Sequence, residues 1–327
     1  MIYNDISPRT QAYADRRLLT RAVPNNILGQ FGQVRTLPQK NTKTINFRRY
    51  NKLAAALSPI MEGVTHTGKT LTKTDLQVSL NQFGDYVWIT DQIQDFHEDP
   101  ILKESTDILG EQAGETYDVL RAGFLKAGTN VLYANGTARS AVNSVASRDL
   151  LRSAVRILKR QEAKTLTSII KAGPNVQSNP IPPAYIAVCH ADLQPDFERM
   201  AGWIPVHQYA SSQGLINGEI GSVGELRVVI DNNLGPWPDA GGLAATNSTL
   251  STSGTQSDVY PILVFGKDAY GIVELSGKNA VQTYVNNPKP SDSDPLAQRG
   301  TVGWKGYHAG LILQDLWMLR IETAAKG

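Results

Sequence analysis

The stretch EGVTHTGKTLTKTDLQVSLNQFGDYVWITDQI (residues 62–93) contains eight letters, Gly63 to Thr70, that match the phosphate-loop pattern of nucleotide hydrolases. A working phosphate loop lies between a hydrophobic strand and a helix, because the loop amides and the helix N-terminus together hold the phosphates. Here Pro59 interrupts the preceding segment, and Leu76 and Val78 alternate with polar residues after it, as in a strand. The stretch therefore predicts the polar tip of a β-hairpin, and a phosphate-loop nucleotide-binding enzyme is the less favoured alternative.

The segments upstream of this tip predict extended structure. TINFRRY (residues 44–50) is a strand candidate, and we expect residues 41–98 to form one long β-hairpin loop. Residues 1–40 show neither helical nor strand periodicity and hold the helix and strand breakers Pro8, Pro24, Gly29, Gly32 and Pro38. We expect them to form an extended arm.

The charge is unevenly distributed along the chain. The net charge is +2, yet residues 1–55 hold ten Lys and Arg residues against Asp5 and Asp15, so this segment carries +8 and the remainder −6. A cationic extension on an acidic body can bind nucleic acid, lie on a neighbouring copy, or simply be solvated.

The downstream half predicts two helices followed by an α/β region. Asp99 can cap a helix that Pro100 begins, and apolar residues at three- and four-residue spacing continue it until Gly128. Such a helix is about 40 Å long, which suits a strut. A second helix is expected after Ser147. From Tyr185 onward, buried-type strands alternate with short helical and glycine-rich segments, and two strands close the chain.

Composition excludes several classes of protein. Hydrophobic residues make up 41% and charged residues 19% of the 327, as in ordinary folded proteins. No apolar run reaches the length of about 20 residues that a membrane span needs, so we expect folding in the cytosol. Cys189 is the only cysteine, which excludes an internal disulfide and a cysteine zinc cage.

Other candidate chemistry is weak. Metal-ligand types gather in TDQIQDFHEDP, namely Asp91, Asp95, His97, Glu98 and Asp99, but their spacing fits no ligand motif, and acidic residues favour helix N-termini. The other histidines are scattered, and no serine or cysteine has neighbours that would activate it. We therefore expect no catalytic residue, cofactor or metal.

The second helix has a basic face. The residues that share it are Arg148, Arg152, Arg156, Lys159 and Arg160. Residues three and four apart lie on one side of a helix, so these cations suit contact with DNA phosphates without reading bases. Solvent exposure or ion pairing with a neighbour is the favoured interpretation of this face, and contact with DNA is the alternative.

The whole arrangement resembles the major capsid proteins of tailed bacteriophages, with an α+β fold of the HK97-like type, closest to the N4-like branch. The likeness rests on four blocks that occur in order across nearly the whole chain: residues 62–93, NGEIGSVGELRVVIDN (217–232), YPILVFGKDAYGIVEL (260–275) and DPLAQRGTVGWKGYHAGLILQDLWMLRIE (294–322).

The resemblance implies a division into parts. These are an N-terminal arm (1–40), an extended loop (41–98), a peripheral domain with a spine helix (99–178), an axial domain (179–278) and return strands of the peripheral domain (279–327). Contacts between subunits are expected at Arg16, Arg17, Arg21, Arg48, Arg49, Lys69 and Lys73.

The resemblance also implies a structural function without an active site. Subunits would associate into pentamers and hexamers of an icosahedral head around double-stranded DNA, with scaffolding, portal and possibly decoration proteins as partners. The protein would be found in the virion after assembly in the host cytoplasm, with no membrane involved. A bacterial nanocompartment shell of the encapsulin type is the alternative with the same fold.

Overall fold

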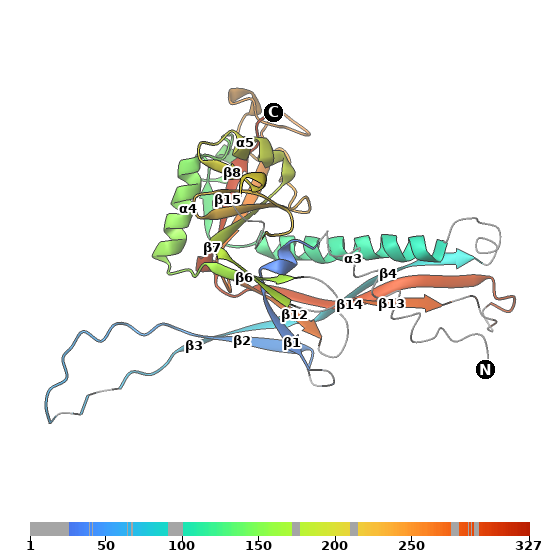
Figure 1. The fold of residues 1–327 in the computed structure, drawn as a ribbon, viewed down its shortest axis with the longest axis horizontal. Helices are drawn as coiled ribbons and strands as arrows, with labels where there is room; N and C mark the ends of the chain where they lie inside the picture. The colour runs from blue at the N-terminus through green and yellow to red at the C-terminus, as the bar shows by residue number, and fades with distance from the viewer. Residues whose placement is uncertain are drawn as a thin grey trace.

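In a computed structural model, the longest fully buried apolar run, Val259–Phe265, forms strand β11 inside an eight-stranded sheet. The structure describes residues 26–90 except 39, 41, 64 and 67, then 101–171, 177–209, 215–275, and 281–327 except 287, 289 and 291–293. Within these residues, three parts are visible in Figure 1: an α/β module, an elongated sheet covered by a long helix, and a two-stranded hairpin.

The α/β module is built on the eight-stranded sheet. Its strands, in spatial order, are β5 (Val131–Tyr133), β15 (Met318–Ala324), β11, β7 (Gln177–Cys189), β10 (Leu226–Ile230), β9 (Glu219–Val223) and β8 (Trp203–Pro205), with β6 (Leu166–Lys171) also paired to β7. Two helices accompany the sheet, α4 (Arg148–Arg160) and the short α5 (Gln194–Glu198). Because both faces of the sheet are covered, β11 is a continuous buried run rather than an alternating one.

The second expected helix is confirmed as α4. Its N-cap is Ser147, whose Oγ accepts a hydrogen bond from the backbone N–H of Leu150 at 3.2 Å. Leu151, Ala154 and Leu158 form its buried side and pack into the core of the module. The basic residues are therefore turned to the opposite, exposed side of α4.

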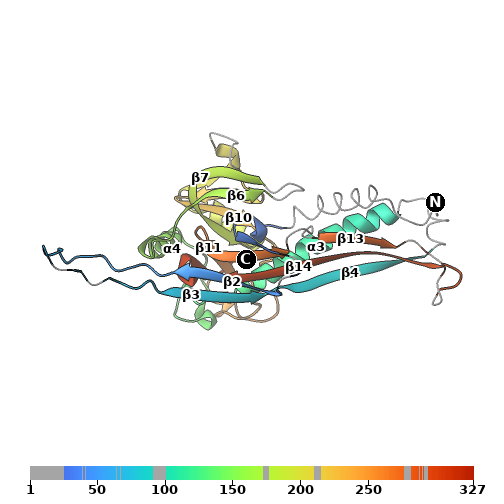
Figure 2. The same cartoon turned by 90° about the horizontal axis from the view of Figure 1, so that it is seen from below.

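The elongated sheet is organised around β14 (Arg299–Ile312). β14 pairs with β4 (Asn81–Thr90), β13 (Val281–Asn286) and β12 (Tyr270–Leu275), and β1 (Gln33–Leu37) adds to β12. Helix α3 (Ile101–Leu125) lies along this sheet, as Figure 2 shows. The expected spine helix is thus confirmed, about 38 Å long at 1.5 Å per residue.

The contact between α3 and the sheet is apolar and aromatic. Leu109, Ala113 and Tyr117 of α3 are buried against Val302 and Trp304 of β14. The rings of Tyr117 and Trp304 meet edge to face with centroids 5.8 Å apart. This seam fixes the helix on the sheet for most of its length.

The hairpin consists of β2 (Thr44–Tyr50) and β3 (Lys73–Ser79), which pair antiparallel from Thr44 opposite Ser79 to Tyr50 opposite Lys73. Beyond them, the described residues of 51–72 extend as an irregular loop. Figure 2 shows this hairpin and the free end of α3 pointing in opposite directions along the long axis. The strand expected at 44–50 is confirmed.

The expectation that residues 1–40 hold no regular element is wrong for residues 28–37. Leu28–Gln30 form a 3-10 turn, η2, and β1 pairs parallel with β12. Ile27, Leu28 and Phe31 are buried in the main core. Their apolar spacing fits no regular period, because a short turn followed by a five-residue strand changes the period halfway.

Sheet membership does not follow the expected boundary at residue 279. Strand β12, on the axial side of that boundary, belongs to the elongated sheet, whereas β15, on the other side, lies inside the α/β module. Likewise β4, expected within the loop, pairs with β14 over ten residues. The physical reason is that strands join the partner that covers their apolar faces, regardless of chain order.

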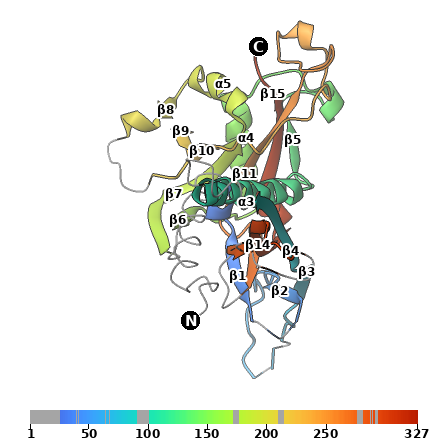
Figure 3. The same cartoon turned by 90° about the vertical axis from the view of Figure 1, so that its right-hand side faces the viewer.

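Figure 3, which looks along the long axis, shows α3 between the α/β module and the elongated sheet. Among the described residues, no helix is long and apolar enough to cross a membrane.

Candidate inter-subunit surfaces and a buried polar network

The loop at the end of the hairpin exposes apolar side chains. Its large apolar residues and their exposed fractions are Leu53 46%, Leu57 89%, Ile60 76%, Met61 73% and Leu71 64%. Figure 1 shows the loop extending away from both sheets, so no other described segment covers it. Such a concentration of uncovered apolar surface is typical of a contact with another molecule.

The expected contact cations of the hairpin have partners in their own chain. Arg48 Nε donates to Asp75 Oδ1 at 2.8 Å, and Lys73 Nζ lies 3.4 Å from the other oxygen of Asp75. Arg49 donates to the carbonyl of Leu313 at 3.2 Å. The hydrogen bond from Arg48 lowers the pKa of Asp75 and raises the pKa of Arg48 itself.

These pairs stabilise the base of the hairpin. A mutation of Arg48 therefore also removes contacts within its own chain. The other expected contact cations, Arg16, Arg17 and Arg21, lie outside the described residues.

The phosphate-loop interpretation of Gly63 to Thr70 finds no support in the described part of the loop. No strand leads directly into Gly63, because residues 51–62 are irregular, and the next element after Thr70 is strand β3 rather than a helix. Lys69 Nζ donates to the carbonyl of Ala54 at 3.0 Å, across the loop. The lysine that would reach a phosphate therefore braces the two arms of the loop instead.

The candidate metal cluster of the sequence lies outside the described residues. Its members are Asp91, Asp95, His97, Glu98 and Asp99, and the absence of a metal there stays a prediction. Among the residues that the structure describes, no group of three or more His, Cys, Asp or Glu side chains is arranged to hold a metal ion.

The basic face of α4 is brought together as expected. All five cations, Arg148, Arg152, Arg156, Lys159 and Arg160, are exposed and line one groove of about 490 Å³ between α4 and the turn joining β9 to β10. Glu225 in that turn accepts from Lys159, and Asp149 lies 4.0 Å from Arg152. Two acidic neighbours against five cations leave the groove positive.

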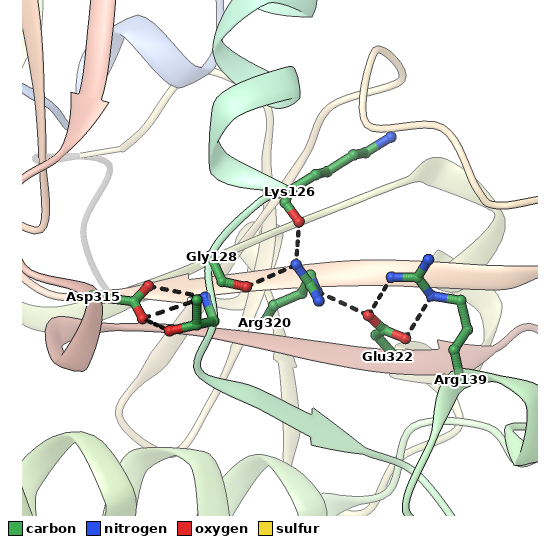
Figure 4. A network of polar contacts seen from close by, with 7 residues as sticks. Lys126, Gly128, Arg139, Asp315, Arg320 and Glu322 are labelled. Atoms are coloured by element: carbon green, nitrogen blue, oxygen red, sulfur yellow. Dashed lines mark hydrogen bonds and ion pairs between the residues drawn. The ribbon is translucent and has the colours of Figure 1, made fainter. Parts of the chain in front are cut away.

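Sequence reasoning missed a buried ionic network at the end of α3. Figure 4 shows Glu322 of β15 between two arginines: Arg139 donates to it at 2.7 and 2.8 Å, and Arg320 donates at 2.9 Å. Glu322 is 0% exposed. A buried carboxylate needs such partners, because its desolvation is costly.

The same network holds the C-terminal end of the spine helix. Arg320 donates to the carbonyl oxygens of Lys126 and Gly128, and the carboxylate of Asp315 accepts from the backbone N–H of Thr129 at 3.1 Å. A cation at a helix C-terminus also complements the helix dipole. This network therefore joins α3 to the α/β module, and its hydrogen-bonded members lie up to 194 residues apart in sequence.

A second buried polar contact lies where α3 covers β14. Arg121 of α3 donates through Nε to Nε2 of His308 at 3.2 Å, and the Tyr117 ring stacks on the imidazole with centroids 5.2 Å apart. Burial, and then the charge of Arg121, lower the pKa of His308 to about 3. The imidazole is therefore neutral at neutral pH and serves as an acceptor.

A sequence profile of the family described as "Phage capsid protein" matches residues 72–320. This span includes β3, α3, most of the α/β module and the central strand of the elongated sheet. The chain belongs to this phage capsid protein family.

Individual relatives agree with the family. The chain is similar to the major capsid protein of Pseudomonas phage KPP21, at 22% identity over 270 residues that cover 77% of this chain and 68% of that protein. The expected structural role, as major capsid protein of a phage, is confirmed by the family and this relative.

Solved structures show the same fold. A chain from the capsid of Ralstonia phage GP4 matches with a TM-score of 0.67 at 15% identity, over 90% of this chain and 87% of that chain. One from the head of Helicobacter pylori bacteriophage KHP40 matches with a TM-score of 0.64 at 14% identity, over 93% and 91%. The expected α+β capsid fold of the HK97-like type is confirmed, and placement in the N4-like branch stays a prediction.

Membership in this family has two consequences. A capsid subunit acts by associating with copies of itself, and it is a component of the virion. The surfaces that matter are therefore those left uncovered in the single chain.

Proposed function

We propose that this chain assembles into pentamers and hexamers of an icosahedral head that encloses double-stranded DNA, and that it has no catalytic activity. The observation that carries the proposal is the exposed apolar loop between Tyr50 and Lys73, with Leu57 89% and Ile60 76% exposed. A two-stranded hairpin is marginally stable alone and has no core in which to bury these side chains. A neighbouring subunit supplies the cover.

The three parts of the molecule suggest a division of labour. The hairpin and its loop lie over a neighbour, α3 with the elongated sheet forms the peripheral strut, and the α/β module is the axial domain. In this division β12 counts with the peripheral part and β15 with the axial part, following sheet membership. The residues before the main core act as the arm, with Arg16, Arg17 and Arg21 as contact cations.

We assign the basic groove of α4 to the packaged DNA. Five exposed cations on one helix suit non-specific contact with phosphates, which requires no base recognition. Assembly takes place in the host cytoplasm with scaffolding and portal proteins, and decoration proteins are further candidate partners.

The test is expression of the full chain with its phage's scaffolding protein, followed by electron microscopy of the purified particles. We expect closed shells with five- and six-fold clusters. Soluble monomers under all conditions would contradict the proposal, and shells filled with a cargo enzyme would favour the nanocompartment alternative.

The DNA assignment needs its own test, in particles produced by infection. Changing Arg152 and Arg156 to Gln should leave shell yield unchanged and reduce the packaged DNA, whereas Arg48→Gln, at the hairpin, should not affect the DNA content of the shells that form. Unchanged DNA content in the α4 variant would overturn the assignment.

A further inference from the structure

Two aspartates lie in the interior where three segments of the chain meet. Asp118 belongs to α3, and Asp231 follows the last residue of β10. Their exposed fractions are 0% and 2%. The backbone N–H of Leu28, in η2, donates to Asp118 Oδ1 at 2.9 Å, and that of Asn233 donates to Asp231 Oδ1 at 2.9 Å.

The second oxygen of each carboxyl lacks a donor. Oδ2 of Asp118 and Oδ2 of Asp231 receive no hydrogen bond from the described part of the chain. The two side chains are close enough that each alters the ionisation of the other. One proton shared between the two carboxyl groups would give both oxygens a hydrogen bond. A buried polar group without a hydrogen bond costs free energy of folding.

Charge balance points the same way. The charge of buried Arg121 acts on Asp118, and the Arg121 guanidinium is held by His308 and Asn26 rather than by a carboxylate. Half-buried Lys126 donates to the carbonyl of Gly235 at 2.7 Å, and its charge acts on Asp231 less strongly than burial and the charge of Asp118 do. One buried guanidinium balances one carboxylate, and the half-buried ammonium offsets a second ionised carboxyl only in part.

The remaining groups around the pair are uncharged, acidic or already paired. The Tyr270 hydroxyl of β12 donates to the carbonyl of Leu28, and burial raises the pKa of Tyr270 and of the Cys189 thiol at the end of β7. Glu115 and Glu219 line the cavity beside Asp231, where Glu219 is paired with Arg227. None of these supplies a positive charge to a second carboxylate.

We propose that Asp118 and Asp231 share one proton and form a latch that fastens α3 and η2 to the end of β10. A cavity of about 520 Å³, lined by Asp231, Asn232, Gly218 and Glu115, gives water access to the latch. When the proton leaves, two buried carboxylates repel, and the spine helix separates from the α/β module at this point. The proposal concerns the single subunit and does not rest on the assembly proposed above.

The sign of the pH dependence follows from proton linkage. Burial, and then the charge of Asp118, raise the pKa of Asp231 to about 8, and burial also raises the pKa of Asp118. The folded chain thus holds a proton that the unfolded chain releases above about pH 4, so stability falls as the pH rises from about 4 to about 8. His308 has the opposite effect on stability, because its lowered pKa makes stability fall as the pH drops below the ordinary pKa of 6.5. The range between pH 6.5 and 8 therefore isolates the latch.

The experiment is thermal melting of the full-length subunit between pH 6.5 and 8, for the wild type, Asp231→Asn and Asp118→Asn. An amide keeps the acceptor for the backbone N–H and donates without a titrating proton. We expect the midpoint of the wild type to fall across this range and the midpoint of either variant to stay level. Asp149→Asn, a 93% exposed control on α4, should fall like the wild type. An equal fall in Asp231→Asn and the wild type would overturn the proposal.

Hydrogen exchange of the wild type provides a reading that needs no variant. After correction for intrinsic rates, protection should decrease between pH 6.5 and 8.5 more strongly in residues 28–30, 115–125 and 226–233 than in β11, which follows only the global loss of stability. Constant protection in those three segments would overturn the proposal even if the variants did not fold.

Discussion

The hairpin loop and the eight-stranded sheet are both rich in apolar residues, but the sheet buries them and the loop exposes them. All seven residues of β11 are buried, whereas Leu57 and Ile60 of the loop are 89% and 76% exposed. In the sheet, helices and neighbouring strands of the same chain cover each apolar face. In the loop, the same chain supplies no cover.

The difference shows where this molecule is complete and where it depends on a neighbour. The α/β module has its own core and a satisfied ionic network, so its stability belongs to the single chain. In the proposed assembly, the loop buries its apolar side chains against another subunit. Mutations should therefore separate into those that affect folding and those that affect assembly.

The largest expected effect comes from placing a carboxylate in the sheet. Leu263→Asp puts a charge into a position with 0% exposure in β11. The cost is several kcal/mol, against a total stability of about 5–15 kcal/mol, and we expect loss of soluble folded protein. The matched change Leu57→Asp, in the loop, should leave the melting curve unchanged by circular dichroism. Similar melting of the two variants would remove the distinction between these regions.

Next in size is the ionic network at the end of α3. Glu322→Gln leaves Arg139 and Arg320 without their shared carboxylate in a buried site, which should cost about 3–5 kcal/mol in the free energy of unfolding. Glu225→Gln, which removes a half-exposed partner of Lys159, serves as the control and should change little. Urea denaturation gives both values, and an equal loss in the two variants would contradict the assigned role of burial.

A smaller effect concerns acid. The pKa of His308 is about 3 in the folded chain. Below pH 6.5 the unfolded chain therefore binds a proton at His308 that the folded chain does not bind. Stability contributed by this group is present above pH 6.5 and is lost as the pH falls, by about 2–3 kcal/mol between pH 6.5 and 4.5. His308→Gln should reduce that loss, while His66→Gln in the exposed loop should not. The difference is read from urea denaturation at the two pH values.

The smallest effect on folding is expected at the base of the hairpin. Reversing Arg48 and Arg49 to Glu puts a like charge opposite Asp75, and we expect an unchanged melting midpoint for the module but weaker assembly, most of all at low salt. Sedimentation at 10 mM and 150 mM salt measures the extent of assembly.

A second change shows where that charge acts. Adding Asp75→Arg restores the pair within the hairpin, so recovery of assembly would show that the charge acts inside the hairpin rather than on the neighbour. Assembly by the double Glu variant that is undiminished at 10 mM salt would contradict a role for these charges.

Local patterns in the sequence predicted local elements well. The helix expected after Ser147 is α4, and the buried-type strand expected from Tyr185 is the end of β7. In each, the stabilising contacts repeat at a fixed spacing within one segment. Such signals are present in the sequence itself.

Non-local contacts could not be predicted in the same way. Arg139 and Glu322 are 183 residues apart, and no pattern in either segment names the other. The assignment of β12 and β15 to different sheets depends on which face each strand can cover. The chain positions Arg48 against Asp75 through hairpin register, which the sequence left open because it did not fix where the turn lies.

The most direct test of the account is removal of the loop tip. Replacing residues 53–71 with a short glycine and serine turn keeps β2 and β3 and the backbone contact between Asn51 and Thr72. Circular dichroism of the subunit and sedimentation with scaffolding protein are then measured together. The account predicts a subunit that melts like the wild type and forms no closed shells, because the apolar surface that a neighbour covers is gone. Full-size shells at the wild-type yield would contradict it.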